Sequence, residues 1–463
     1  MKSKILLIRF GTYTFVAVLL VFGALFAILP KQKVSENEKR DLASMPKFSW
    51  ASLFSGKFTD SLDIFVSDNF PFREGFLQTN FALSQMRGFK SEVSFYQQEV
   101  VTNAGIDKIQ DSTIVVVEDT FKPENEIIDG EAEKSPIRGV MIYNNMAIQM
   151  FGGNKAAAKY SAEVVNYFQE TLKDKAQVYS VVVPTHQEFY LPHKYRHVSE
   201  KENIKYLYSL LKPEVKSVDV TSALYKHKSE YIYFNTDHHW TGLGAYYAYQ
   251  EFCKVANLEA VPLEKMERKV INGFLGSLYW LTRDRRLKEK GDSVVYHKPQ
   301  VECKVFSHPK KNPDKRFGGL LFAEFAKGGA AYSVYLGDDF SLVQVDTEVK
   351  NGRKAMFIKN SYGNAFAPYL VSHFEQIFIV DYRYWNKSLL KMIEEHKITD
   401  VILFHYSFSA NTIPDLQRIK ALLKGFEEKA KNQDKSSKPK KDTLKEEILP
   451  KDSLLKSHLV DKQ

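Results

Sequence analysis

The sequence YIYFNTDHHWTGLGAYYAY, residues 231–249, decides which fold and which chemistry this chain can have. It begins as an extended aromatic run, turns at a polar loop, and continues as a helix that Thr241 can cap. The loop holds Asp237, His238 and His239, which suit a metal site, a catalytic relay or a polar knot at a helix start. The rest of the sequence has to distinguish these three possibilities.

Apolar runs with the length of buried strands alternate with helical stretches along much of the chain. The clearest helix is predicted at 155–174, where apolar residues recur with helical spacing. Strands that alternate with helices predict an α/β fold, with a mostly parallel sheet covered on both faces. The predicted strands are QVYSVVVP (177–184), KAMFIKN (354–360), QIFIVDY (376–382) and DVILFHYSF (400–408).

Two segments interrupt this alternation of strands and helices. Between residues 262 and 350, polar and apolar residues alternate, as in SVVYHKPQVECKVF, which predicts an antiparallel β insertion within the α/β domain. Residues 95–136 are acidic and irregular, and we expect a short β insertion there. The sequence assigns neither insertion a role.

The N-terminus has the pattern of a membrane segment. A basic stretch at 2–9 precedes residues 10–30, which carry no charge and are long enough to cross about 30 Å of hydrocarbon as one helix. A cleaved signal peptide would have a shorter apolar region and an A-x-A site, whereas Ala24 and Ala27 are three apart. We therefore predict an uncleaved anchor at 1–30, with everything after it outside the cytoplasm, at the cell surface or in the periplasm.

The remaining organisation follows from composition. Residues 31–55 are polar and are predicted to be a linker, and residues 56–423 form the domain that carries the site. The segment 424–463 holds eleven lysines and eight acidic residues, with no aromatic residue after Phe426. That composition is typical of a disordered tail.

Net charge and cysteine content exclude several classes of protein. The net charge of +9 comes largely from lysine-rich stretches, and no nucleic-acid motif is present, so we expect no nucleic-acid partner. A weakly basic exterior suits anionic envelope polymers or lipid head groups. Cys253 and Cys303 have no zinc-binding spacing; they are either bonded to each other or two buried thiols.

Polar residues leave the predicted strands at the edge where open parallel sheets bind ligands, and FIKNSYGNAF is the clearest of these exits. Ser361 lies where a strand turns into a helix, so N–H groups of the helix start can point toward whatever its oxygen attacks. This is the geometry of an acyl-transfer nucleophile. Taken alone, the pattern also fits a serine that caps the helix.

The opening loop supplies what a serine nucleophile needs. A serine hydroxyl attacks only when a base takes its proton, and the base works best when an acid fixes its tautomer. In an extended segment residues two apart project to one side, so Asp237 pairs more easily with His239 than with His238. We predict that His239 is the base, and that Trp240 and Tyr233 shield the site from water. Trp240 is also a candidate for binding the oxyanion or the substrate.

A metal site is the alternative interpretation of the same loop. The motif DHH occurs in manganese-dependent phosphoesterases, where aspartates from several strand ends complete a two-metal site. Upstream of Asp237 the sequence holds isolated aspartates such as Asp219, without a matching set of motifs. We therefore expect no metal and no cofactor.

Three stretches together resemble the DHHW proteins, which are similar to the alginate O-acetyltransferase group of membrane-anchored, SGNH-hydrolase-like proteins. The resemblance extends over about residues 36 to 415, and the combination of motifs is specific although no single motif is. The stretches are TDHHW, IKNSYGNAFAPYLVSHFEQIFIVDYRYW and SGKFTDSLDIFVSDNFPFRE.

The resemblance implies an SGNH-like three-layer α/β/α fold with a Ser-His-Asp triad, in which the family's D-x-H element falls on Asp237 and His239 and its serine on Ser361. His238 then occupies the variable middle position. The chain departs from the family in one place, because Asn360 stands where aspartate commonly precedes the serine. Candidate oxyanion donors are the backbone N–H of Ser361 and the side chain of Asn364.

Two residues that leave the neighbouring strand, Tyr382 and Arg383, are candidates for binding an acceptor sugar or an acid group. The alternative for this pair is structural, because Asp381 can simply form an ion pair with Arg383 at the rim.

Proteins of this kind work beside a multi-pass membrane acyltransferase that delivers acetyl groups, which they pass to a polysaccharide hydroxyl. The resemblance thus implies an extracytoplasmic O-acetyltransferase that acts on a cell-surface polysaccharide or exopolysaccharide. Two alternatives stay open: an acetylesterase that uses the same triad with water, and a non-catalytic polysaccharide-binding envelope protein.

Overall fold

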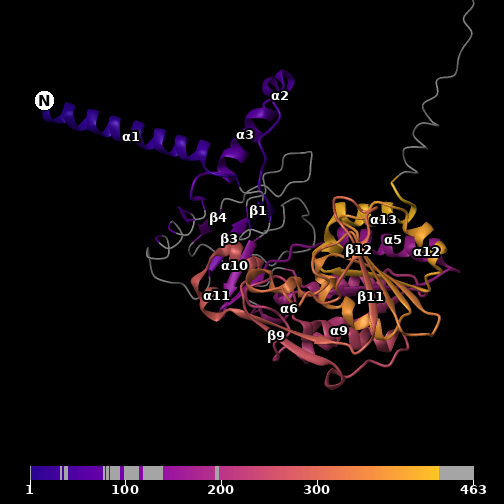
Figure 1. Cartoon of the computed structure of the whole chain (residues 1–463). Coiled ribbons are helices and arrows are strands. Elements are labelled where there is room, and N and C mark those ends of the chain that lie inside the picture. The colour runs from indigo at the N-terminus through magenta and orange to yellow at the C-terminus, as the bar shows by residue number, and fades with distance from the viewer. Residues whose placement is uncertain are drawn as a thin grey trace, which may run out of the picture.

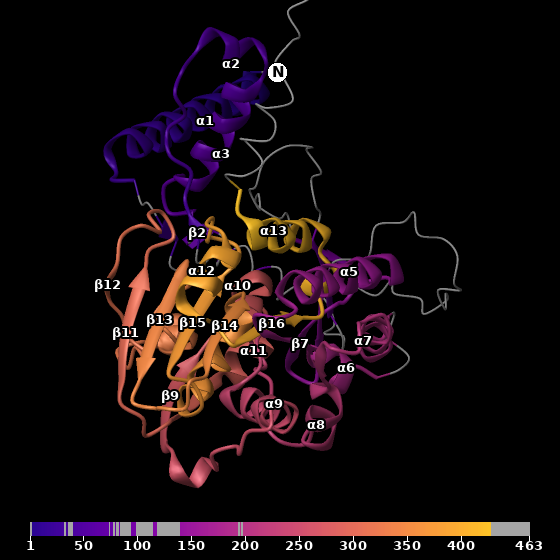
Figure 2. The ribbon, with the colours of Figure 1, turned by 90° about the vertical axis from the view of Figure 1, so that its right-hand side faces the viewer.

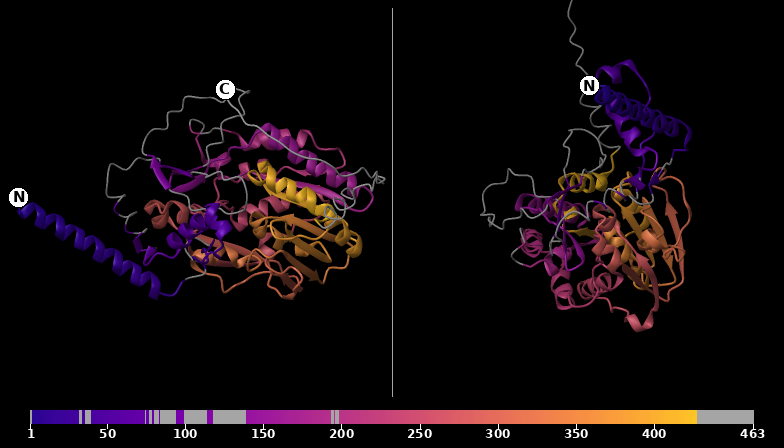
Figure 3. Two further views of the ribbon diagram at one scale, coloured as in Figure 1. Left: turned by 90° about the horizontal axis from the view of Figure 1, so that it is seen from above. Right: turned by 90° about the vertical axis from the view of Figure 1, so that its left-hand side faces the viewer.

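The computed structural model describes the chain in several stretches, which are residues 2–31, 34–35, 40–73, 75–76, 79, 83, 94–98, 114–117, 139–192, 195 and 198–426. Within them an α/β body is built around one large sheet, and the helix α1 extends away from that body (Figures 1 and 3).

An eight-stranded sheet forms the centre of the body, in the order β12-β11-β13-β15-β14-β16-β7-β8. Its five strands β15, β14, β16, β7 and β8 pair in parallel. The residues of β7, β14, β15 and β16 are mostly apolar and almost all buried, as expected for parallel strands covered on both faces, whereas β8 at the edge has two exposed residues. The mostly parallel sheet predicted from the sequence is confirmed. The five strands are β7 (Gln177–Val183), β8 (Lys216–Val218), β14 (Lys354–Lys359), β15 (Gln376–Asp381) and β16 (Asp400–Tyr406).

Helices lie on both faces of this sheet (Figure 2). On one face α5, α12 and α13 pack on side chains such as Met356 and Leu403. On the other face α8 and α9 pack on the alternate side chains, such as Phe357 and Phe404. The helices are α5 (Lys155–Leu172), α7 (Glu200–Ser209), α8 (Val220–Lys226), α9 (Gly242–Val255), α12 (Leu389–His396) and α13 (Ile413–Lys424).

The segment 262–350 contains antiparallel strands that fall into two groups. β11, β13 and β12 extend the edge of the central sheet, while β9 and β10 pair in a separate two-stranded sheet. Short helices connect them. The elements are β9 (Glu267–Phe274), α10 (Ser277–Thr282), α11 (Arg285–Lys290), β10 (Asp292–Lys298), β11 (Cys303–His308), β12 (Phe317–Gly318) and β13 (Leu342–Thr347), with the 3₁₀ helices η2 (Leu263–Lys265) and η3 (Gly328–Val334).

A four-stranded antiparallel sheet, in the order β4-β3-β5-β6, lies beside the body. Two of its strands fall in the segment 95–136, for which we expected a β insertion, and the other residues of that segment lie outside the described part. The strands are β3 (Ser94–Gln98), β4 (Ile114–Val117), β5 (Gly139–Tyr143) and β6 (Met146–Gln149). A further short helix, α6 (His186–Tyr190), follows β7 of the central sheet.

The N-terminal elements precede the body. Within α1, residues Arg9–Ile28 are long and apolar enough to cross a membrane, a property shared by membrane anchors and signal sequences. The predicted linker contains short elements of its own, and the predicted tail lies outside the described residues after 426. The N-terminal elements are α1 (Lys2–Ile28), β1 (Val34–Ser35), β2 (Arg40–Asp41), α2 (Trp50–Phe54) and α3 (Lys57–Asp68). Both cysteines are free thiols, so of the two alternatives for Cys253 and Cys303 the unbonded one holds.

Candidate active site

Ser361 lies directly after β14, at the carboxyl edge of the parallel strands, where it begins the 3₁₀ helix η4 (Ser361–Ala365). The loop that carries Asp237 and His239 lies opposite. A β-bridge between Tyr233 and Trp240 closes that loop just before α9 begins. Two segments separated by 122 positions thus meet at the edge that binds ligands in open α/β sheets.

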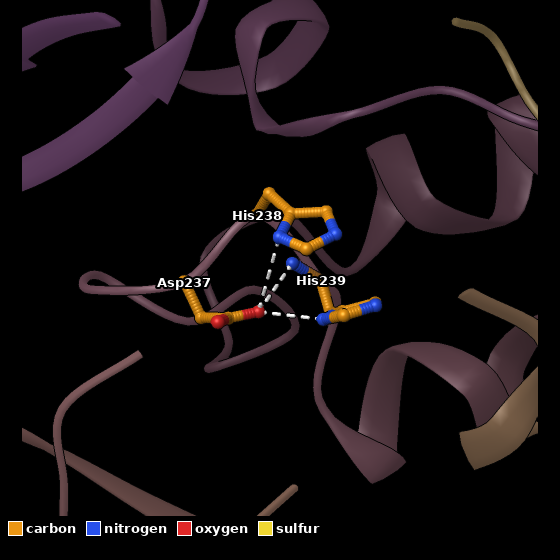
Figure 4. Close-up of side chains that lie close together, drawn as sticks. All are labelled: Asp237, His238 and His239. Carbon is orange, nitrogen blue, oxygen red and sulfur yellow. Dashed lines mark hydrogen bonds and ion pairs between the residues drawn. The ribbon is translucent and has the colours of Figure 1, made fainter. Parts of the chain in front are cut away.

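Three side chains form a continuous chain of hydrogen bonds at this edge. The Nδ1 of His239 lies 2.6 Å from Oδ1 of Asp237, and its Nε2 lies 3.1 Å from the Oγ of Ser361. Because a carboxylate only accepts, Nδ1 carries the proton of the neutral ring and Nε2 is left to accept from the Ser361 hydroxyl. Figure 4 shows one oxygen of the Asp237 carboxylate facing both histidines from the same side, and its contact with the His239 ring is the shorter of the two.

Asp237 is held as a carboxylate by its surroundings. Burial acts to raise the pKa of Asp237, but the electrostatic interactions with His239 and His238 and the hydrogen bonds from His239 and the Ser277 backbone outweigh it, so the pKa lies well below its ordinary value. The backbone N–H of His239 donates to Oδ1 at 3.0 Å, and the backbone N–H of Ser277 donates to Oδ2 at 2.7 Å. These contacts fix both oxygens of the carboxylate.

The loop itself is tied to the antiparallel insertion by one buried carboxylate. Asp292, at the start of β10, accepts from the backbone N–H groups of Asn235 and Thr236 at 2.9 and 2.7 Å. It also accepts from the hydroxyls of Thr236 and Tyr231. Asp292 therefore satisfies the backbone donors immediately before Asp237, which sets where the Asp237 carboxylate can lie.

Two aromatic side chains fix the backbone around Ser361. The hydroxyl of Tyr332 donates to the Ser361 carbonyl at 3.1 Å, and its ring stacks on the His239 ring with centroids 4.0 Å apart. The indole N–H of Trp240 donates to the carbonyl of Tyr362 at 3.0 Å. Trp240 and Tyr233 are fully buried and pair across the base of the loop, and their shielding of the site from water stays a prediction.

The residue before the serine has a structural reason to be asparagine. The side chain of Asn360 accepts from the backbone N–H of Tyr362 and donates to the hydroxyl of Tyr382, whose own proton goes to Asp415. An aspartate in place of Asn360 would offer Tyr382 a second acceptor and no donor. Asparagine at position 360, where the family commonly has aspartate, therefore fits the hydrogen-bonding partners around it.

Among the residues predicted to bind the substrate or the oxyanion, Tyr382 and Asn364 both form hydrogen bonds to other side chains of the protein. Tyr382 is fully buried and its hydroxyl is shared between Asn360 and Asp415, which does not fit direct contact with an acceptor. One side-chain N–H of Asn364 donates to Asp339 at 3.0 Å, and because the amide carries a second N–H, its role as an oxyanion donor stays a prediction.

Arg383 forms ion pairs with two carboxylates. The pair with Asp381 is the structural alternative to substrate binding that the sequence offered, and Asp339 is a second partner. Its guanidinium donates to both oxygens of Asp381, at 2.9 and 2.7 Å, and lies 2.8 Å from Asp339. Although burial acts to raise the pKa of Asp339, Arg383 and Lys359 hold that pKa well below its ordinary value. The positive charge at this edge is therefore balanced by two carboxylates.

His238 lies beside the relay and outside its hydrogen-bond chain. Its Nδ1 lies 2.7 Å from the hydroxyl of Ser277 and 3.6 Å from Asp237. Burial, followed by the neighbouring His239, lowers the pKa of His238, so the ring is neutral at pH 7.

Asp237, His238 and His239 also form the one group in the described part of the chain that could hold a metal ion, with ligand atoms within 4.8 Å of one another. An ion bound between Asp237 and His239 would replace the proton on Nδ1 and break the hydrogen bond that orients the ring. The relay and a metal site are therefore mutually exclusive uses of these residues.

Residues that sequence reasoning missed come mainly from the insertion at 262–350. Tyr332, Asp292, Ser277 and Gly276 all touch the relay or its loop. The sequence gives no motif around these residues, and their contacts depend on how the insertion folds back. The insertion, which the sequence left without a role, thus supports the site.

The fold and the site together define an α/β protein with an Asp-His-Ser hydrogen-bond relay at the carboxyl edge of a mostly parallel sheet. The DHHW protein family model matches residues 38–136 and 134–380, and the chain belongs to this family. The comparison with curated proteins found no match.

Solved structures agree with this assignment. A DHHW family protein from Eubacterium siraeum is 32% identical, with a TM-score of 0.57, over 62% of this chain and 96% of that chain. PatB1 from Bacillus cereus is 19% identical, with a TM-score of 0.51, over 59% of this chain and 97% of that chain, which shows a shared fold alone. The O-acetyltransferase domain of Pseudomonas putida AlgJ matches at 12% identity with a TM-score of 0.35, over 60% of this chain and 96% of that chain, and carries no structural argument.

Replacing Gly276 by alanine tests how tightly Asp237 must be placed. A Cβ at this position would lie 2.2 Å from the Cβ of Asp237 and 2.4 Å from its Oδ2, so the carboxylate has to move. A shift of about 1 Å can cost about 10²-fold in rate, and we expect Gly276→Ala to lower kcat for acetyl-ester hydrolysis to that extent. Gly318→Ala, at a site with open space, is the matched control; equal rates in the two variants would contradict the placement.

Replacing Tyr332 by phenylalanine keeps the ring stacked on His239 but removes the hydrogen bond to the Ser361 carbonyl. Loss of one such bond costs about 1 kcal/mol, so we expect kcat to fall about fivefold with little change in KM. Tyr247→Phe, which removes a hydroxyl bonded to Glu230 at the surface, is the control and should leave kcat unchanged. Steady-state kinetics on a chromogenic acetyl ester provide the measurement.

Proposed function

We propose that the chain is an acyltransferase that carries an acyl group on Ser361, and that the group is acetyl. One observation carries the proposal: the hydrogen-bond chain from Asp237 through His239 to the Ser361 hydroxyl, with distances of 2.6 and 3.1 Å. A serine with a positioned base, whose tautomer is fixed by a carboxylate, is an activated nucleophile.

In the first step Nε2 of His239 takes the proton of Ser361 while Oγ attacks the acyl carbonyl carbon. The tetrahedral intermediate then collapses, the bond from carbon to the leaving oxygen breaks, and that oxygen receives the proton from His239. Asp237 stays ionised and stabilises the protonated ring, which its low pKa supports. The product of this step is an acyl-serine.

In the second step an acceptor hydroxyl gives its proton to the same Nε2 and attacks the acyl carbon. Collapse releases the acylated acceptor, and the proton returns to Oγ of Ser361. The backbone N–H of Ser361 and the second side-chain N–H of Asn364, whose first N–H is bonded to Asp339, are our candidates to stabilise the oxyanion in both steps.

The acceptor class comes from the resemblance to alginate O-acetyltransferase-like proteins, which favours a hydroxyl of a cell-surface polysaccharide or exopolysaccharide. One of the solved structures of PatB1 carries a sulfonyl adduct. A sulfonyl group joined covalently to a protein requires a nucleophile there, which agrees with nucleophilic chemistry on this fold.

We further propose that α1 is an uncleaved anchor that keeps the α/β body outside the cytoplasm, beside a multi-pass membrane acyltransferase that supplies acetyl groups. The apolar window Arg9–Ile28 and the basic residues before it support this topology. The site would then lie on the side where an envelope polysaccharide is found.

An acetylesterase is the second candidate function, since water in place of a sugar hydroxyl completes the same second step. A non-catalytic polysaccharide-binding protein is the third, which the intact relay disfavours. Incubation with an acetylated donor and candidate glycans separates these three: transfer gives an acetylated glycan, hydrolysis gives acetate alone, and a binding protein gives neither.

The relay predicts which substitutions abolish chemistry. Ser361→Ala and His239→Ala should each lower release of acetate from a chromogenic ester by about 10³-fold or more, since members of a triad act as a unit. Asp237→Asn should cost about 10⁴-fold through the wrong tautomer. His238→Gln, beside the relay, is the control and should retain most activity. Wild-type rates in the first two variants would refute the proposal.

A chelator distinguishes the relay from a metal site. Because Nδ1 of His239 has to keep its proton for the relay, we expect EDTA treatment followed by dialysis to leave ester hydrolysis unchanged. Loss of activity with EDTA, and its return when Mn²⁺ is added back, would instead support a metal site at Asp237, His238 and His239.

A further inference from the structure

The residues that follow α3 form a turn rich in phenylalanine, which we call the phenylalanine turn (residues 70–73 and 75–76). Phe70, Phe72 and Phe76 are 40%, 63% and 47% exposed. Three exposed aromatic side chains within seven positions form an apolar patch that is unusual on a surface facing water.

This patch is continuous with the apolar surface of α1. The ring of Phe70 stacks on that of Phe22 with centroids 5.4 Å apart, and the ring of Phe76 lies 5.8 Å from it. Just before the turn, the ring of Phe65 meets that of Phe26 at 5.9 Å. The partners on α1 all lie inside the window that is apolar enough to cross a membrane.

These contacts set the depth of the turn. Phe22 lies six residues before the end of the window at Ile28, which corresponds to about 9 Å along a helix that rises 1.5 Å per residue. If α1 spans a hydrocarbon layer of about 30 Å, rings packed on Phe22 lie within its outer leaflet.

The backbone of the turn is compatible with that environment. The N–H groups of Asn69, Arg73 and Phe76 donate to carbonyls of the same segment at 3.0 to 3.1 Å, which lowers the cost of taking the turn out of water. Phe72 has a positive φ of 58°, which is strained for a bulky side chain. Strain of this kind persists where a side chain has to be displayed, and here it exposes the Phe72 ring.

We propose that the phenylalanine turn inserts into the outer leaflet beside α1, so that a lipid bilayer covers this patch. The turn then acts as a second membrane contact, and it limits how far the site can move from the surface where the acyl donor is found. This inference rests on the proposed anchoring by α1 and does not depend on the acyl-transfer chemistry.

A spin label on the turn tests the depth directly. The full chain, with Phe72→Cys in a Cys253→Ala and Cys303→Ser background, is reconstituted in phosphatidylglycerol and phosphatidylethanolamine liposomes. Flotation first shows whether α1 inserts. We expect the ratio of collision rates with oxygen to those with a water-soluble nickel complex to be several-fold higher at 72 than at Tyr225→Cys, an exposed position on α8.

Three results of this experiment would overturn the inference. Equal ratios at the two positions would place the turn in water, and a label shielded from both reagents would mean that protein covers it, as a transmembrane partner would require. If the chains do not float with the liposomes, both the proposed anchoring by α1 and the insertion of the turn are refuted. A loss of esterase activity alone would count against the proposed acyl-transfer function and would not bear on either membrane contact. If the cysteine-free background does not fold, Phe72→Trp in the otherwise unaltered chain replaces the spin label. Insertion then predicts that brominated lipids quench the additional tryptophan fluorescence, and no quenching would contradict it.

Discussion

The hydrogen bond between the Asp237 carboxylate and Nδ1 of His239 is the interaction on which the site depends. It fixes the proton on one ring nitrogen, which leaves the other nitrogen to face Ser361. A bridge between Tyr233 and Trp240 closes the loop, and Asp292 satisfies its backbone donors. The same short loop that precedes α9 therefore also places the His239 ring at the edge of the central sheet.

The antiparallel insertion supports the site as much as the central sheet does. It supplies Tyr332, which contacts both His239 and Ser361, and Gly276, whose missing side chain leaves room for Asp237. The parallel strands provide the rigid edge that carries Ser361, while the insertion closes the site from the other side. In this arrangement one part of the chain fixes Ser361 and another fixes Asp237 and His239.

Much of the fold could be predicted because strand and helix periods are local properties of the sequence. The buried strands β7, β14, β15 and β16 correspond to continuous apolar runs, and the 262–350 segment showed the alternation of antiparallel strands. Spacing also placed His239, rather than His238, next to Asp237, and the distances of 2.6 and 3.6 Å bear this out. The partners of Asn364 and Tyr382 could not be predicted, since Asp339 and Asp415 lie 25 and 33 positions away and become neighbours only after folding. For Arg383 the sequence offered the ion pair with Asp381, which the structure contains, but gave no sign of the second ion pair with Asp339.

Covalent trapping of the nucleophile tests the central claim most directly. After incubation with a sulfonyl fluoride, the account predicts a mass increase of one sulfonyl group on the peptide that contains Ser361, and none in the His239→Ala variant. A label on a different residue, or equal labelling in the variant, would contradict the claim that His239 activates Ser361.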